Sequence, residues 1–172
     1  MYNIAVIGGS TEHGEACAGA YTIGKLLAQK GVALINGGGE GVMECVSRGA
    51  YENEGLIVGI IPGTNPENGN KYLSVSLPTG IGYARNFLII RAADSVIALQ
   101  GSSGTLSEAS FAITEGKSVI SLGDMAINNL KPGDGKFIKI SDPEEAVEIA
   151  IKEAEIQRSL ERSRKSYWNE FA

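Results

Sequence analysis

The sequence has little cysteine and histidine, no excess of positive charge and no long apolar run. Its 172 residues include two Cys and one His, and the formal net charge is −5. No segment reaches the ~18 consecutive apolar residues of a membrane span, and the N-terminal apolar run lacks the length and basic flank of a signal peptide. An acidic chain also offers no broad basic face to nucleic acid. We therefore expect a cytoplasmic protein that binds neither membranes nor nucleic acids.

The cysteines and the histidine form no pattern typical of a metal or redox site. Cys17 and Cys45 lie far apart in segments with helical patterns, so we expect two separate, small core residues in a reducing compartment. His13 has no second ligand at a metal-site spacing, and we expect it to lie in a loop. The sequence thus predicts no metal and no required cofactor.

Short apolar runs alternate with helical patterns along the whole chain. With 43% hydrophobic residues, the chain can build one filled core, so we expect a single domain over residues 1–172. The alternation predicts an α/β fold, a Rossmann-like domain whose doubly wound, mostly parallel sheet carries helices on both faces. The predicted strands are 4–7, 32–35, 56–61, 72–77, 95–99, 118–122 and 137–140, and the predicted helices are 15–30, 41–53, 82–93, 105–116 and one that begins at 143.

The last predicted helix begins well but ends without a core-facing pattern. Asp142 and Pro143 are typical of a helix start. Beyond Gln157 the pattern becomes mixed charge, yet the chain closes with the aromatic residues Tyr167, Trp168 and Phe171. Such residues are better explained by docking on a partner subunit than by exposure. We expect a homodimer or tetramer in which residues 143–172 contribute a contact.

Small residues gather after three of the predicted strands. Because parallel strands end at one edge of the sheet, these turns are expected to meet there, where α/β proteins bind ligands. Open backbone amides and the positive end of a following helix favour an anion. The sequence predicts a bound phosphate, nucleotide or nucleotide-like phosphate ester on three groups of residues: Gly8, Gly9 and Ser10; Gly37, Gly38, Gly39, Glu40 and Gly41; and Gln100, Gly101, Ser102, Ser103, Gly104 and Thr105.

Two familiar phosphate motifs do not fit the chain. Residues 19–25 match G-x4-G-K, but Leu26 replaces the Ser or Thr that binds magnesium, and the stretch lies inside a helical pattern. Val42 stands where the third glycine of G-x-G-x-x-G should be. A P-loop enzyme and a standard dinucleotide-binding enzyme are therefore disfavoured.

Two charged residues flank the last glycine-rich turn. Arg85, on the helix that leads into strand 95–99, can either bring a positive charge to the ligand or pair with a surface acid. Its neighbour Asn86 is expected to contact the ligand. Glu108 also has two readings. Thr105-x-x-Glu108 is a capping-box pattern, in which the glutamate bonds back to the cap amide. Alternatively, Glu108 is a catalytic carboxylate.

The two glycine motifs resemble those of the Rossmann-like superfamily once labelled lysine decarboxylases, which includes the Lonely Guy phosphoribohydrolases. Their G-G-G-x-x-G-L-M-G corresponds to residues 37–44, which are one residue shorter and lack the last glycine. Their P-G-G-x-G-T-x-x-E corresponds to residues 100–108, with Gln100 for proline and Ser102 for the second glycine. Arg85 matches the family's catalytic arginine, but Asn86 stands where those enzymes usually have lysine. The resemblance covers about residues 2–151 and is nearer to a smaller branch that includes molybdenum cofactor carrier proteins.

The resemblance implies two classes of function. In the first, the protein binds a nucleotide or a pterin-type cofactor. In the second, it hydrolyses the N-glycosidic bond of a nucleoside 5′-monophosphate, with Arg85 on the phosphate and Glu108 steadying the sugar cation. Binding is favoured, because the departures fall in the catalytic signature. Lysine decarboxylation is not supported, since the sequence shows no sign of a pyridoxal-phosphate lysine site.

Overall fold

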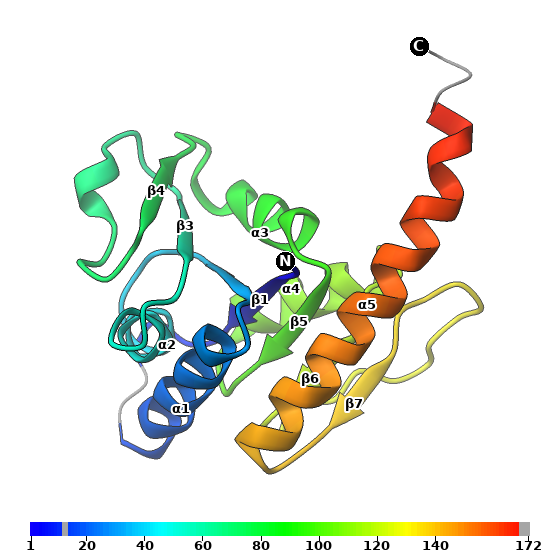
Figure 1. The fold of residues 1–172 in the computed structure, drawn as a ribbon, viewed down its shortest axis with the longest axis horizontal. Coiled ribbons are helices and arrows are strands. Elements are labelled where there is room, and N and C mark those ends of the chain that lie inside the picture. Colours follow the sequence, from blue (N-terminus) through cyan, green and yellow to red (C-terminus); the bar gives the residue numbers. More distant parts are fainter. Residues whose placement is uncertain (12–13, 169–172) are drawn as a thin grey trace.

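A single parallel sheet forms the centre of the computed structural model, which describes residues 1–11 and 14–168, with side chains up to 161. Within these residues the sheet has seven strands in the order β4-β3-β2-β1-β5-β6-β7, and every neighbouring pair is parallel (Figure 1). The strands are β1 (Asn3–Ile7), β2 (Ala33–Asn36), β3 (Ile57–Ile61), β4 (Val75–Pro78), β5 (Ser95–Ala98), β6 (Val119–Ser121) and β7 (Phe137–Lys139). The predicted α/β fold is confirmed.

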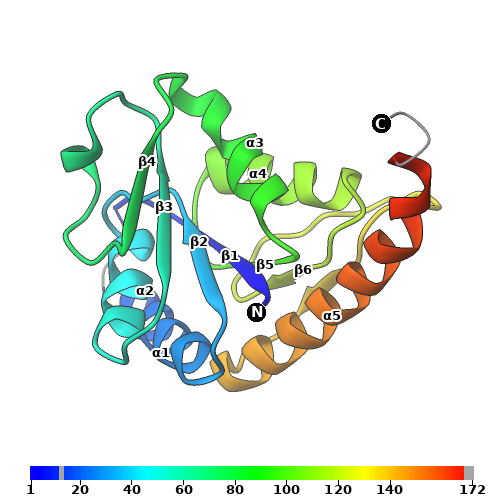
Figure 2. The same ribbon diagram turned by 45° about the horizontal axis from the view of Figure 1, so that its top comes forward.

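Helices cover both faces of the sheet, as the doubly wound prediction requires. Side chains of α1, α2 and α5 pack in one apolar cluster and those of α3 and α4 in another. Figure 2 shows these two groups on opposite faces. The predicted helix 82–93 is instead a short 3-10 turn followed by an α-helix. The elements are α1 (Glu15–Gln29), α2 (Val42–Tyr51), α3 (Asn86–Ala92), α4 (Ser103–Thr114), α5 (Pro143–Trp168) and the 3-10 turns η1 (Pro66–Asn68) and η2 (Gly82–Arg85).

Helices α1 and α2 approach each other closely because glycines face the contact. A Cβ placed on Gly24 would lie 2.0 Å from the carbonyl oxygen of Val46, and one on Gly49 would lie 2.0 Å from that of Tyr21. Any larger residue would push the helices apart. Residues 19–25, which match the P-loop spacing, lie inside α1 as predicted. Their last glycine, Gly24, serves helix packing.

The expectation of two separate thiols is wrong. Cys17 on α1 and Cys45 on α2 form a disulfide, with their Cα atoms 5.4 Å apart and a sequence separation of 28. The reason is the close helix contact, which brings the two positions together although neither segment shows this in its own sequence pattern. His13 lies outside the described residues.

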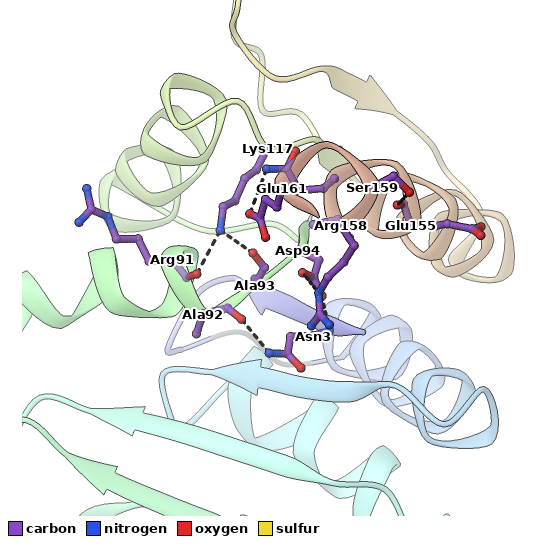
Figure 3. A network of polar contacts seen from close by, with 12 residues as sticks. Asn3, Arg91, Ala92, Ala93, Asp94, Lys117, Glu155, Arg158, Ser159 and Glu161 are labelled. Carbon is purple, nitrogen blue, oxygen red and sulfur yellow. Dashed lines mark hydrogen bonds and ion pairs between the residues drawn. The ribbon is translucent and has the colours of Figure 1, made fainter. Parts of the chain in front are cut away.

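Figure 3 shows a polar network that holds α3 and α5 at the N-terminal ends of β1 and β5. The buried Lys117 ammonium donates to the carbonyls of Ile90, Arg91 and Ala93 at the end of α3, and burial lowers the pKa of this lysine. Asp94 accepts from the backbone of Asn3 and from Arg158 on α5. The network therefore holds the end of α3 that is remote from Arg85.

Helix α5 starts as the sequence predicts, since the Asp142 carboxylate accepts from the Glu145 N–H at 2.8 Å. The aromatic side chains of Tyr167, Trp168 and Phe171 lie outside the described side chains, so the homodimer or tetramer stays a prediction. No helix in the described part of the chain is long and apolar enough to cross a membrane.

Candidate functional site

The main cavity lies at the carboxyl ends of three adjacent strands. Strand β1 has β2 on one side and β5 on the other, so the chain changes direction across the sheet at this point. Open α/β sheets bind ligands at such switch points. The cavity has a volume of about 670 Å³, within the range of small-molecule sites. It brings together eleven of the predicted site residues: Gly8, Gly9, Ser10, Gly37, Arg85, Asn86, Ser102, Ser103, Gly104, Thr105 and Glu108.

The remaining predicted contacts lie outside this cavity. The carbonyls of Gly38 and Gly39 accept from Asn70, which ties their loop to residues near η1. Glu40 is exposed, and Gly41 lies against the backbone of Gly9 and Ser10. Gln100 and Gly101 line a second, neighbouring cavity. Ligand contact by these six residues stays a prediction.

The N-terminus of α4 offers backbone amides to the main cavity. The helix begins at Ser103, and the side chain of Ser102, its N-cap, makes no capping hydrogen bond. The first amides of an α-helix have no acceptor within the helix and carry the positive end of its dipole. A Cβ on Gly104 would meet nothing within 4 Å, so the space above this turn is open. This end of α4 can hold an anion.

The capping-box reading of Glu108 is wrong because α4 begins two residues earlier than predicted. Thr105 is the third residue of the helix, so Glu108 lies in its second turn, beyond reach of the cap amide. The glutamate side chain instead lines the cavity and is only 9% exposed. The burial of this carboxyl in the cavity wall is therefore not explained by helix capping.

Arg85 faces Glu108 in the same cavity. Its Nη1 lies 3.9 Å from Glu108 Oε1 and donates to Asn86 Oδ1 at 2.7 Å, while its buried Nε has no hydrogen-bond partner among the described residues. A Cβ on Gly37 would lie 2.6 Å from both Nη atoms, so only glycine lets the guanidinium rest here. The guanidinium is thus held in place between Gly37, Asn86 and Glu108.

Burial raises the pKa of the Glu108 carboxyl from its usual 4.5 to about 7, and the nearby Arg85 charge offsets part of this rise. Burial also lowers the pKa of the Arg85 guanidinium, and the negative charge of Glu108 offsets part of this decrease. Near neutral pH the carboxyl is therefore present both with and without its proton. Such a group can donate or accept a proton or a hydrogen bond.

Two aromatic side chains in the cavity wall were not predicted from the sequence. Tyr83 on η2 is 91% exposed, and Phe87 on α3 packs edge-on against Phe111 with ring centroids 4.4 Å apart. Both lie two residues from Arg85 in the sequence, which is the signal that could have identified them. They give the mouth of the cavity an apolar, aromatic side.

The sequence of this chain matches a known family over most of its length. Residues 1–147 match the SLOG cluster4 family. The chain belongs to this family. The SLOG cluster4 chain is also 37% identical over 151 residues, or 88% of its length, to an uncharacterised protein of Archaeoglobus fulgidus, of which it covers 95%. A probable cytokinin riboside 5′-monophosphate phosphoribohydrolase of Oryza sativa subsp. japonica is 34% identical over 92 residues, which is 52% of this chain and 44% of that protein.

Two solved structures show the same fold. The molybdenum cofactor binding protein of Rippkaea orientalis superposes with a TM-score of 0.78 at 34% identity, covering 86% of this chain and 94% of that one. The molybdenum cofactor carrier protein of Chlamydomonas reinhardtii does so with a TM-score of 0.77 at 26% identity, covering 90% and 98%. These matches confirm the predicted place of this SLOG cluster4 protein in the Lonely Guy-like superfamily, near the molybdenum cofactor carriers.

Proposed function

We propose that this protein binds a nucleotide-like phosphate ester, of the nucleotide or pterin-cofactor class, in the main cavity. The observation that carries the proposal is that Arg85 and the uncapped start of α4 line one cavity. A guanidinium and free helix amides are complementary to a phosphate. The aromatic residues Tyr83 and Phe87 in the same wall suit a flat ring attached to it.

The relatives support this proposal. The structures from Rippkaea and Chlamydomonas are those of proteins described as binding or carrying the molybdenum cofactor. The rice relative is described as acting on a nucleoside 5′-monophosphate. We infer that a phosphate group is what the ligands of these two groups of relatives have in common. We extend it to this chain on the strength of Arg85 and the glycine-rich start of α4.

Arg85→Met should weaken the binding of AMP, used as a probe, by about 10- to 100-fold, the effect of losing hydrogen bonds to a charged group. Isothermal titration calorimetry of both proteins measures this loss. Arg91→Met is the matched control, because Arg91 lies at the other end of α3, which Arg85 directly precedes, and is exposed and pairs with Glu115. Equal loss in the two variants, or none in Arg85→Met, would contradict the assigned role.

The alternative function is a phosphoribohydrolase, and the specific observation that favours it is the Glu108 pKa of about 7. A carboxyl with this pKa suits proton transfer, and its ionised form can stabilise a developing sugar cation. If wild type releases base from AMP, Glu108→Gln should still bind AMP but release base at least ~100-fold more slowly. Chromatography of the reaction mixture measures the free base. Release at equal rates would exclude Glu108 from catalysis, and no release by wild type would leave binding as the function.

A further inference from the structure

A second cavity of about 280 Å³ adjoins the main one and has no role in the function proposed above. It lies beyond the ends of β5 and β6, and the two cavities share Ser102 and Ser103. The first turn of α4 therefore lies between the two cavities. A phosphate held by the amides of this turn lies between the two spaces, and only one of them is needed for a nucleoside.

The lining of the second cavity differs in charge from that of the first. Leu106, Leu122 and Met125 give it an apolar side, and Gln100 and Asp124 give it polar groups. Among the described residues that line it, Asp124 is the only one with an ionisable side chain. A carboxylate repels a phosphate but accepts hydrogen bonds from hydroxyl groups. The cavity thus suits a neutral group with hydroxyls on one side and C–H bonds on the other, as in a sugar.

The backbone that lines the second cavity is hydrogen-bonded to a loop of the main cavity. The Gln100 carbonyl accepts from the Gly9 N–H at 3.0 Å, so the wall of one cavity is bonded to the loop of the other. A Cβ on Gly101 would lie 2.1 Å from Thr105 Oγ1, which keeps this turn packed against α4. Both cavities are therefore lined by the same closely packed turn.

We propose that the second cavity is a subsite for a neutral, hydroxyl-bearing group on the far side of the ligand's phosphate. This inference rests on the proposed function, because the main cavity must hold the nucleoside and the start of α4 the phosphate. The ligand class is then a nucleotide whose phosphates carry a second substituent, as in a nucleoside diphosphate sugar. A simple monophosphate would occupy only part of the site. Gln100 and Gly101, outside the main cavity, become ligand contacts in this arrangement.

The test compares ADP with ADP-glucose, which share the nucleoside diphosphate. ADP-glucose carries a glucose on the terminal phosphate in place of one ionisable oxygen. Wild type is expected to bind ADP-glucose at least ~10-fold more tightly by calorimetry, since the sugar adds hydrogen bonds to a charged acceptor. Ala126→Trp is designed to fill the second cavity. Because Ala126 is an exposed loop residue, the substitution should leave the folding of the protein unchanged. It should abolish the preference for ADP-glucose and leave the Kd for ADP unchanged. Ala126→Ser is the control and should keep the preference.

A second variant checks the chemistry. Asp124→Ala should weaken ADP-glucose binding by about 10-fold and leave ADP binding unchanged, because only the sugar meets this carboxylate. Equal affinity of wild type for the two probes, or a preference that survives Ala126→Trp, would overturn the subsite and leave the proposed function intact. If neither probe nor AMP binds, the proposed function fails and the subsite fails with it.

Discussion

Glu108→Gln is expected to stabilise the protein by about 3 kcal/mol at pH 8 and to leave its stability at pH 4 nearly unchanged. In the folded protein the pKa of Glu108 is about 7, above the usual 4.5, so the folded state holds this proton more tightly than the unfolded chain does. The contribution is therefore fully present below pH 4.5 and is lost as the pH rises through 7. Glutamine, which has no charge to bury, does not suffer this loss.

Urea denaturation of both proteins between pH 4 and pH 8 measures the effect as a difference that grows with pH. Glu40→Gln is the control, since Glu40 is exposed at the same edge of the sheet and its replacement should change stability by less than ~0.5 kcal/mol at either pH. A stability difference between wild type and Glu108→Gln that does not vary with pH would contradict the raised pKa. A variant less stable at pH 8 would show that the Arg85 ion pair outweighs burial.

The double variant Cys17→Ser, Cys45→Ser is expected to lose about 3–4 kcal/mol of stability relative to the oxidised protein, the entropy of closing a loop of this length in the unfolded chain. The two residues lie near the starts of α1 and α2, directly behind the loops that carry Gly9 and Gly37 into the cavity. Guanidinium denaturation of the oxidised protein, with and without dithiothreitol, measures the loss.

The double variant supplies its own control, because dithiothreitol should have no effect on it. The chain has only these two cysteines, so any response of the wild type to the reductant comes from this one bond. Two free thiols in protein purified under air would contradict the disulfide. Equal stability of the oxidised wild type and the double variant would show that the bond adds no constraint to the unfolded chain.

The sequence by itself determined the strands and helices of this protein. Runs such as Ile4–Ile7 and Ser95–Leu99 are short, mostly apolar and followed by small-residue turns, and such local patterns predict buried parallel strands without any knowledge of their neighbours. The same patterns placed the small-residue turns after β1, β2 and β5. Since the sheet is parallel, these turns had to meet at one edge. The place of the main cavity therefore followed from the sequence.

Only the tertiary structure decided which residues meet there and in what chemical state. The disulfide between Cys17 and Cys45 depends on how closely two helices pack, which neither helix encodes in its own periodicity. The state of Glu108 depends on where α4 begins and on burial beside Arg85, and a shift of two residues changed it from a helix cap to a carboxyl with a raised pKa. Periodicity and caps are local properties of a chain, whereas burial and charge proximity join segments that the sequence keeps apart.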